Sequence, residues 1–340
     1  MAEDDGRSRG RRERLHVPPG HYYSPIPSEP DITRAIGGAT APDSAVPAQL
    51  PGIDLRGTEQ LEMLASWLPA YRALPEWRGR DGRRFTYDNT WFTYADAVTY
   101  ALMLPEHRPA RVIEVGCGYS SALALDVDEL FLESRTQFTF IDPYPDRLQQ
   151  LVSRADLAGR LRAVEVQDVA PAEFTALGVG DILFIDSSHV LKAGSDVQYL
   201  LDRVLPVLAP GVLVHFHDVF YPFEYPPDWL RAGVAFNEAY AVRTLLTGGA
   251  AWRIELFHPY LANSHRDWLR RNMPLLLAGA WYGRSAFIGE RDPTTNYQFT
   301  TVQRGDVEDV VTATGTLQPR DYVDVGAQVS GQLRKIHVEV

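Results

Sequence analysis

The stretch Arg111-Val-Ile-Glu-Val-Gly-Cys-Gly-Tyr-Ser-Ser121 decides the fold. An apolar run comes first, then an acid, Glu114, and then two glycines, Gly116 and Gly118, followed by small polar residues. This order predicts a buried β-strand, a tight glycine turn and the start of a helix. Glycines let the backbone approach a ligand closely, and the N–H groups of the following helix can bind an anionic group.

The chain after this stretch alternates between short apolar runs and amphipathic segments. The predicted strands are Val112–Val115, Phe138–Ile141, Leu161–Val166, Asp181–Ile185 and Val212–Phe216. The predicted helices between them start at Ser120 and then cover Pro145–Leu157, Pro171–Ala176 and Ser195–Leu208. Short apolar strands that alternate with helices indicate an α/β fold, in which a parallel sheet is covered by helices on both faces.

Further elements are predicted on both sides of this alternating region. Helical spacing of apolar residues predicts helices over Thr58–Leu74 and Tyr94–Leu104, and another over Ala235–Leu246. Two further strands are predicted at Trp252–Phe257 and Ser285–Ile288, where they could form a closing pair.

Composition divides the chain into four regions. We expect a largely disordered N-terminal arm over residues 1–50, rich in charge, Pro, Gly and Ala, and a helical N-terminal cap over residues 51–110. Residues 111–290 form the main domain, and residues 291–340 form a polar connector followed by a partial β segment. Within the arm, the aromatic stretch His21–Pro27 is expected to lie extended on the folded body, with an unattached linker as the alternative.

Charge and cysteine content exclude several classes of protein. The 340 residues carry a formal net charge of −11, which argues against a general nucleic-acid-binding protein. Cys117 is the only cysteine, so neither an intramolecular disulfide nor a cysteine-rich zinc site can form. No run reaches the ~18 apolar residues that a membrane helix needs, and no apolar segment follows the N-terminus. We therefore expect a cytoplasmic protein without a membrane partner.

Polar residues follow each predicted strand. The strands end in Glu114, in Asp142, in Gln167-Asp168, in Asp186-Ser-Ser-His189 and in His217-Asp218. Because ligands of parallel α/β sheets bind beyond the carboxyl ends of the strands, we expect these side chains to gather at one edge. Any single acid at such a position is more often a helix cap or a turn residue, so the prediction depends on the whole set.

The order of glycine turn, Asp142 and Gln167-Asp168 resembles the class I S-adenosylmethionine-dependent methyltransferases over residues 75–290. The resemblance implies a Rossmann-like sheet of seven mostly parallel strands, the last one antiparallel, which suits Ser285–Ile288. It also implies that Asp142 binds the ribose hydroxyls, that Asp168 or its neighbour binds the adenine, and that Tyr144 packs on the adenine. The implied cofactor-binding residues are Glu114, Gly116, Gly118, Asp142, Tyr144 and Asp168.

A second, narrower resemblance concerns Asp186-Ser-Ser-His189 together with His217-Asp218. This pair of motifs resembles that of metal-dependent O-methyltransferases, including the sugar O-methyltransferases of macrolide biosynthesis. The resemblance implies that Asp186, His217 and Asp218 bind a divalent cation such as Mg²⁺, and that His189, next to the catalytic Asp186, is the general base. A cation held this way can bind substrate oxygens and lower a hydroxyl pKa.

Histidine at position 217 departs from that family pattern, which places an acid or an amide there. A softer metal or no metal therefore stays open, and so does the reading of His189 and His217 as ordinary polar residues at the sheet edge. His215 is interpreted as a strand residue because of its alternation. The aromatic loop 219–229, with Asn237 and Tyr240 on the next helix, is interpreted as the wall of an acceptor pocket.

The C-terminal text from Thr301 to Leu333, with Gly315, Gly326 and Gly331 at intervals, resembles the opening of periplasmic adaptor subunits of tripartite efflux pumps. The chain stops within an apparent strand. We interpret this segment as a fused or truncated remnant without a transport role of its own.

Together these observations predict a methyltransferase that uses S-adenosylmethionine and methylates a hydroxyl of a small molecule. One alternative is a nucleotide-dependent oxidoreductase, which is disfavoured because Ser121 stands where the dinucleotide fingerprint has its third glycine. Another is a non-enzymatic protein related to efflux adaptors. The identity of the acceptor, the choice between O- and N-methylation and the presence of a homo-oligomer stay open at this stage.

Overall fold

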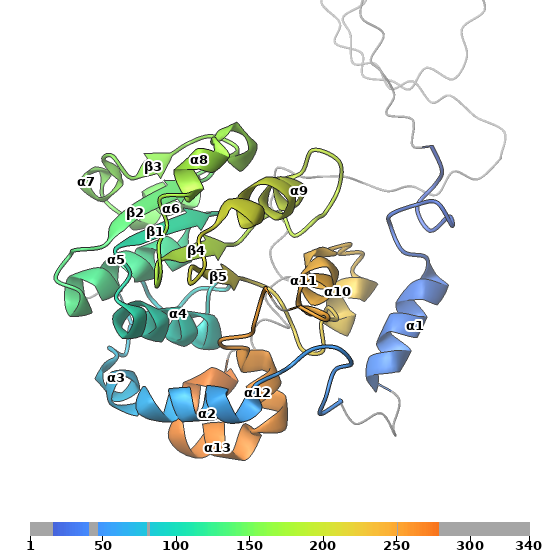
Figure 1. Ribbon diagram of the computed structural model, residues 1–340, viewed down its shortest axis with the longest axis horizontal. Helices are drawn as coiled ribbons and strands as arrows, with labels where there is room; N and C mark the ends of the chain where they lie inside the picture. The colour runs from blue at the N-terminus through green and yellow to red at the C-terminus, as the bar shows by residue number, and fades with distance from the viewer. Residues whose placement is uncertain (1–15, 41–46, 80–81, 250, 279–340) are drawn as a thin grey trace, which may run out of the picture. The chain divides into compact units, whose positions relative to one another are not determined.

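The computed structural model describes residues 16–40, 47–79, 82–249 and 251–278, and these are built around a five-stranded, all-parallel sheet (Figure 1). The strands are β1 (Arg111–Val115), β2 (Gln137–Ile141), β3 (Leu161–Arg162), β4 (Ile182–Ile185) and β5 (Leu213–Phe216). Their order in the sheet is β3-β2-β1-β4-β5. The Rossmann-like α/β prediction is confirmed in this coarser form, whereas seven strands are not seen in the described part of the chain.

The strand order reverses between β1 and β4. From β1 the chain moves outward to β2 and β3, and it then returns to β4 on the other side. The register places Val115 opposite Ile185, so the two strands end side by side. In open α/β sheets, a crevice for ligands forms beyond the carboxyl ends of the strands at such a reversal.

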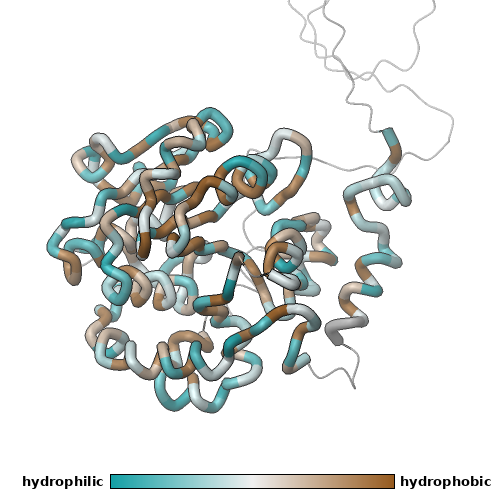
Figure 2. The backbone as a smooth tube through the Cα atoms, viewed as in Figure 1, coloured by the Kyte–Doolittle hydropathy of each residue, from teal (hydrophilic) through white to brown (hydrophobic). Residues whose placement is uncertain are grey.

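Alternation of side chains along the strands builds two cores, one on each face of the sheet. Val112, Phe138 and Phe184 join the core that contains α4 (Tyr94–His107) and α5 (Tyr119–Phe131). On the opposite face, strand residues pack with Phe174 of α8 (Pro171–Phe174) and with the π-turn Leu200–Val204. Because both faces of the sheet are covered, β4 is apolar throughout, and β1 and β2 send apolar residues to both cores. Figure 2 colours the backbone by hydropathy, and hydrophobic segments occur within the sheet region.

The remaining described elements are short helices. They are α1 (Glu29–Thr40), α2 (Gly57–Ser66), α3 (Leu68–Ala73), α6 (Asp146–Leu151), α7 (Arg154–Leu157), η1 (Val166–Asp168), α9 (Asp196–Tyr199), η3 (Leu205–Val207), α10 (Pro227–Arg231), α11 (Glu238–Leu246), α12 (His258–Ser264) and α13 (Arg266–Asn272). No helix in these described ranges is both long and apolar enough to cross a membrane.

Several predicted elements are shorter than expected. The strand predicted to reach Val166 ends at Arg162 and is followed by η1. The helix predicted over Pro145–Leu157 breaks at Ser153, whose hydroxyl accepts a hydrogen bond from the backbone of Asp156 and so caps a new helix, α7. Side chains that cap helices or form turns thus interrupt helices that the spacing of apolar residues alone predicts to be continuous.

The prediction of a strand over Trp252–Phe257 is wrong, because these residues form no strand. Their polar backbone groups bond to α2 and the residue that precedes it instead. The carbonyl of Ile254 accepts from the Arg56 guanidinium at 2.8 Å, and the Phe257 N–H donates to the Gln60 side chain at 2.6 Å. The predicted strand Ser285–Ile288 and the segment 291–340 lie outside the described residues.

The predicted arm contains a helix that the sequence analysis did not foresee, α1. Its residues Ile32, Ala35 and Ile36 pack against an aromatic cluster that includes Tyr225 and Trp229. The aromatic stretch before it does not pack on the body as expected. There, Tyr22 and Tyr23 are exposed over 90% and 71% of their surface.

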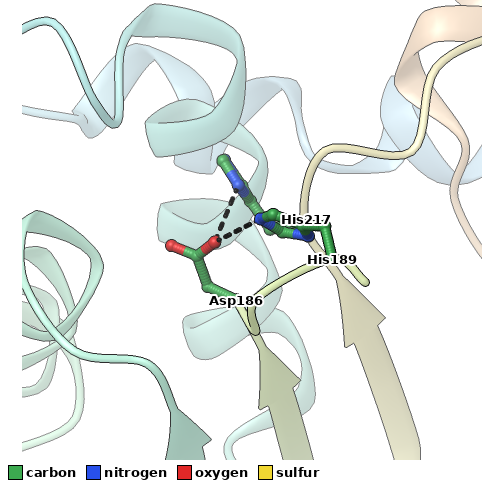
Figure 3. Close-up of side chains that lie close together, drawn as sticks. All are labelled: Asp186, His189 and His217. Carbon is green, nitrogen blue, oxygen red and sulfur yellow. Dashed lines mark ion pairs between the residues drawn. The ribbon is translucent and has the colours of Figure 1, made fainter. Parts of the chain in front are cut away.

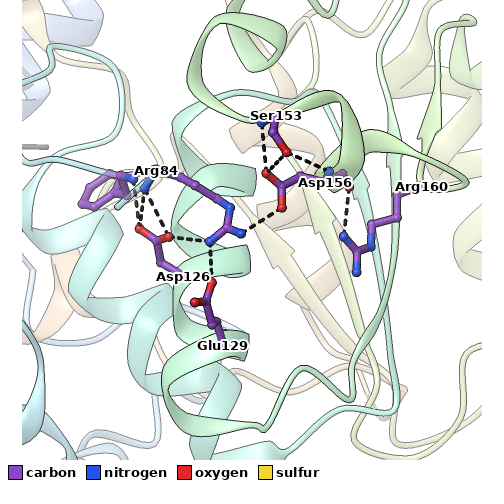
Figure 4. A network of polar contacts seen from close by, with 7 residues as sticks. Arg84, Asp126, Glu129, Ser153, Asp156 and Arg160 are labelled. Atoms are coloured by element: carbon purple, nitrogen blue, oxygen red, sulfur yellow. Dashed lines mark hydrogen bonds and ion pairs between the residues drawn. The ribbon is translucent and has the colours of Figure 1, made fainter. Parts of the chain in front are cut away.

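A network of charges around Arg84 connects the loop before α4 to α5 and α7 (Figure 4). The guanidinium donates at 3.0 Å to Asp126, at 2.8 Å to Glu129 and at 2.8 Å to Asp156. Asp126 also accepts from the backbone N–H groups of Arg84 and Phe85. We call Arg84, Asp126, Glu129 and Asp156 the Arg84 network.

Candidate active site and metal centre

One cavity of about 1980 Å³ runs along β5, from the residues before the strand to the carboxyl ends of β1, β4 and β5. Its lining includes the glycine turn from Gly116 to Ser120 together with Asp142. It also includes the residues that follow β4 and β5, which are Asp186, Ser187, Ser188, His189, His217 and Asp218. The structure therefore brings together most of the residues that the sequence analysis singled out.

The glycine turn approaches the neighbouring strand closely. Gly116 has a φ of +82°, and a Cβ on it would lie 1.8 Å from the backbone oxygen of Asp186. Only glycine can occupy this position without moving that backbone. The Cys117 N–H donates to the Asp142 carboxylate at 2.9 Å, so the end of β2 is connected to the turn.

Glu114, predicted to bind the cofactor, lies beneath the turn and does not line the cavity. Its side chain is fully buried and accepts hydrogen bonds from the hydroxyls of Ser120 and Ser121 in the first turn of α5. Burial raises the pKa of Glu114 to about 8, against the opposing effect of the two serines. In the structure, Glu114 holds the start of α5.

The structure does not bring Tyr144 or Asp168 to the cavity. Tyr144 is 79% exposed, and its N–H donates to Asp142 at 2.7 Å. Asp168 is exposed at the end of η1. Their roles at an adenine ring stay predictions.

Asp186, His189, His217 and Asp218, which we call the His–Asp cluster, meet where β4 and β5 end. In Figure 3 both imidazoles are directed toward the Asp186 carboxylate. Oδ1 of Asp186 lies 3.3 Å from Nε2 of His189 and 3.3 Å from Nδ1 of His217. Asp218 lies 3.7 Å and 3.6 Å from the same two nitrogens.

Two further carboxylates stand behind the histidines, and the sequence analysis missed both. Glu238, the first residue of α11, is buried and lies 2.9 Å from Nδ1 of His189. It also accepts a hydrogen bond from the Ser187 hydroxyl at 3.0 Å. Asp96 of α4 lies 3.8 Å from Nε2 of His217. Each acid occupies the first turn of a helix, where the helix dipole favours acidic residues in any protein. The sequence therefore gave no separate indication that these two acids contact the histidines.

Mutual attraction perturbs the titration of the cluster. Burial disfavours the charged form of His189, but hydrogen bonding to Asp186 and Glu238 outweighs it and raises the pKa to about 10. Burial also opposes charge on His217, whose pKa is nevertheless raised well above its ordinary value by Asp218 and Asp186. The pKa of Asp186 is lowered by both histidines in spite of its burial. Opposite charges thus dominate over desolvation for Asp186 and the two histidines, whereas burial raises the pKa of Asp218.

The backbone at the cluster is held in an uncommon conformation. His189 and Asp218 have φ values of 57° and 53°, in the left-handed region that few residues other than glycine adopt. The carbonyl of His189 accepts from the N–H groups of Asn237 and Glu238 at the start of α11. Such strained positions, held by the surrounding packing, concentrate at functional sites.

The residues present fit a divalent cation. The side chain of His217 is only 7% exposed, yet neither of its ring nitrogens makes a hydrogen bond. One ligand atom each from Asp186, His189 and His217 can be chosen so that all lie within 4.8 Å of one another. Buried imidazole nitrogens without hydrogen-bond partners beside a carboxylate form a typical metal-binding donor set once the rings have lost their extra proton. This set includes His189, which the sequence analysis had assigned as the base.

The aromatic segment that follows Asp218 lines the same cavity, including Phe220, Tyr221 and Tyr225. The Tyr225 hydroxyl accepts a hydrogen bond from the Ala239 N–H at 3.0 Å, which connects the loop to α11. Asn237 accepts from the Leu191 N–H at 2.6 Å. The aromatic loop therefore shares the cavity with the His–Asp cluster, whereas Asn237 and Tyr240 of the predicted wall do not line it.

Residues 113–219 match a protein family described as a methyltransferase domain. The matched region includes the glycine turn, Asp142 and the His–Asp cluster. The chain thus carries a methyltransferase domain, and the match supports the class that the sequence resemblance indicated, a class I S-adenosylmethionine-dependent methyltransferase. No solved structure matches the chain significantly.

Each curated relative matches only a part of the chain. An uncharacterized protein of Archaeoglobus fulgidus is 33% identical over 132 residues, which is 38% of this chain and 58% of that protein. The pyoverdine export membrane fusion protein PvdR of Pseudomonas aeruginosa is 48% identical over 66 residues, or 19% of this chain and 15% of PvdR. PvdR of Pseudomonas putida is 72% identical over 39 residues, or 12% of this chain and 10% of that protein. The chain therefore spans less than two thirds of each of these relatives.

Proposed function

We propose that this chain transfers a methyl group from S-adenosylmethionine to a hydroxyl oxygen of a small molecule. One observation carries the proposal: a single cavity joins the glycine turn and Asp142 at one side to the His–Asp cluster and the aromatic loop at the other. A methyltransferase needs such an arrangement, because the methyl donor and the acceptor oxygen must meet within one enclosed space.

The cofactor side is proposed to be the turn with Asp142. Gly116 and Gly118 leave the backbone accessible, and each oxygen of Asp142 accepts one backbone N–H, from Cys117 and from Tyr144. A carboxylate has about four acceptor positions, so Asp142 can still accept from a ribose diol. The cofactor supplies an electrophilic methyl group on a sulfonium.

The acceptor side is proposed to be the His–Asp cluster. A hydroxyl becomes a good nucleophile only when its proton is removed or its pKa is lowered. The sequence-derived assignment, His189 as base with a cation held by Asp186, His217 and Asp218, stays a prediction. Nδ1 of His189 is held by Glu238, so Nε2 is the nitrogen that remains for the cavity. Because Asp186 and Glu238 outweigh burial and raise the pKa of His189 to about 10, a base role requires a cation at Asp186 that lowers this pKa again.

The negative net charge and the aromatic, proline-containing wall favour a small neutral or aromatic-bearing acceptor over nucleic acid. The export-protein similarity is too short, at 10–15% of those proteins, to support a transport role. We therefore propose no function for it.

Cofactor binding tests the proposal. Calorimetry with S-adenosylhomocysteine, in the presence of EDTA, should show one micromolar site in the wild type. Asp142→Ala should weaken binding at least ~10-fold, since it removes the ribose acceptor. Asp146→Asn is the matched control, because this exposed acid of α6 does not line the cavity. Absence of binding in the wild type, or equal effects of the two variants, would overturn the proposal.

A further inference from the structure

We infer that the His–Asp cluster is a binding site for a first-row transition-metal dication rather than for Mg²⁺, with Nε2 of His189, Nδ1 of His217 and Oδ1 of Asp186 as its protein ligands. The inference rests on the proposed function only in placing this cation at the acceptor side of the cavity. It reassigns His189 from base to ligand.

The distances carry the choice of ligands. With bonds of about 2.1 Å, neighbouring ligand atoms around a metal lie roughly 3.0–3.4 Å apart. The Asp186 oxygen lies 3.3 Å from each of the two histidine nitrogens (Figure 3). Both nitrogens thus stand equivalently beside one carboxylate oxygen, whereas Asp218 lies farther from each of them.

The donor types carry the choice of metal. Mg²⁺ prefers oxygen ligands and retains several waters, while imidazole nitrogens favour Zn²⁺, Co²⁺, Ni²⁺ or Fe²⁺. Two of the three donors here are imidazoles, both less than a tenth exposed. Asp218 is close enough to supply a further oxygen or to bind a metal-bound water.

Carboxylates behind the histidines support a ligand role. Histidine ligands of metals almost always donate their second N–H to an acceptor that fixes the ring orientation. Glu238 does this for His189, at 2.9 Å from Nδ1, and its own position is fixed by the Ser187 hydroxyl. Asp96 lies on the corresponding side of His217. Glu238 is therefore a positioning residue for the site.

Metal titration of the full chain, stripped of metal with a chelator, tests the inference. By calorimetry Zn²⁺ and Co²⁺ should each bind at one equivalent, at least ~100-fold more tightly than Mg²⁺. Bound Co²⁺ should show the visible absorption of a nitrogen-ligated site. His217→Asn, which replaces a nitrogen donor by an amide oxygen, should reduce the Zn²⁺-to-Mg²⁺ preference at least ~10-fold. His265→Asn, outside the cavity lining, is the control.

Glu238→Gln should weaken Zn²⁺ binding about 10–100-fold, because the neutral amide holds His189 less firmly. Glu224→Gln is its control, since this cavity carboxylate bonds to Tyr240 and not to the cluster. Circular dichroism checks that each variant is folded.

The outcomes separate this inference from the proposed function. No bound metal, equal affinity for Mg²⁺ and Zn²⁺, or an unchanged preference in His217→Asn overturns the inference. If S-adenosylhomocysteine still binds in EDTA, the proposed function stands without it. Metal binding as expected, without any S-adenosylhomocysteine binding, supports the inference and overturns the proposed function.

Discussion

The Arg84 network and the His–Asp cluster contain similar residues and differ in how their charges are used. In the Arg84 network, three carboxylates accept hydrogen bonds of 2.8–3.0 Å from one guanidinium (Figure 4). In the His–Asp cluster, opposite charges stand 3.3–3.7 Å apart, and the imidazole of His217 makes no hydrogen bond. Closely bonded charges hold a fold together even though Nε of Arg84 has no hydrogen-bond partner, whereas more widely spaced charges leave donors and acceptors available to a ligand.

The largest expected effect on stability comes from removing the cation of the Arg84 network. Arg84→Met should lower the free energy of unfolding by about 3 kcal/mol, because it leaves the nearly fully buried Asp126 without its cation. Chemical denaturation followed by circular dichroism measures this. Arg135→Met is the control, since this exposed arginine pairs only with exposed Glu133 and should change stability by less than about 0.5 kcal/mol. Equal effects of the two substitutions would contradict the assignment.

The second-largest expected effect is a loss of stability in acid, when the carboxylates of the Arg84 network are protonated. Burial opposes the charge of Asp156, but hydrogen bonds from Arg84 and Ser153 lower its pKa to about 2 from an ordinary 3.8. The ionised carboxylate thus adds stability that is complete above the unfolded-state pKa and is lost as the pH falls through about 2. The gap in unfolding free energy between wild type and Asp156→Asn should shrink by about 2 kcal/mol from pH 6 to pH 2. A gap that does not change with pH would refute this.

The smallest of the three effects on stability should come from a substitution in the His–Asp cluster. His217→Phe, measured in EDTA, should lower the free energy of unfolding by about 1 kcal/mol. It removes one cation from beside the buried acids, but His189 stays 3.3 Å from Asp186 as a counter-charge. The imidazole lies 5.3 Å from the ring of Phe92, so an aromatic replacement keeps the packing. A loss as large as that of Arg84→Met would mean that the cluster serves the fold. Both variants can be compared in one denaturation series.

The sequence predicted those parts of the site that follow from local pattern. Gly116, Asp142, Asp186 and His217 each end a strand, and the ends of parallel strands share one edge, so their meeting needed no knowledge of long-range packing. Glu238 reaches His189 from a helix 49 residues later in the chain. Such contacts depend on how a helix packs, which a period of apolar residues does not specify.

The wrong prediction of a strand has a physical cause of the same kind. Trp252–Phe257 has the apolar content of a strand, but its backbone groups are bonded to Arg56 and Gln60 from the cap region. The cofactor role of Glu114 stays a prediction, and the structure adds that its side chain is buried under α5 and bonded to Ser121. Neither contact leaves a trace in the local sequence.

Gly116 has a wider consequence. The missing side chain at this position makes room for the backbone oxygen of Asp186, which would otherwise lie 1.8 Å from a Cβ. The absence of a Cβ at residue 116 therefore determines both the shape of the turn after β1 and the position of Asp186 after β4. The cofactor side and the acceptor side of the cavity therefore cannot be redesigned separately. A larger residue at position 116 would change the glycine turn and would also displace the backbone of Asp186.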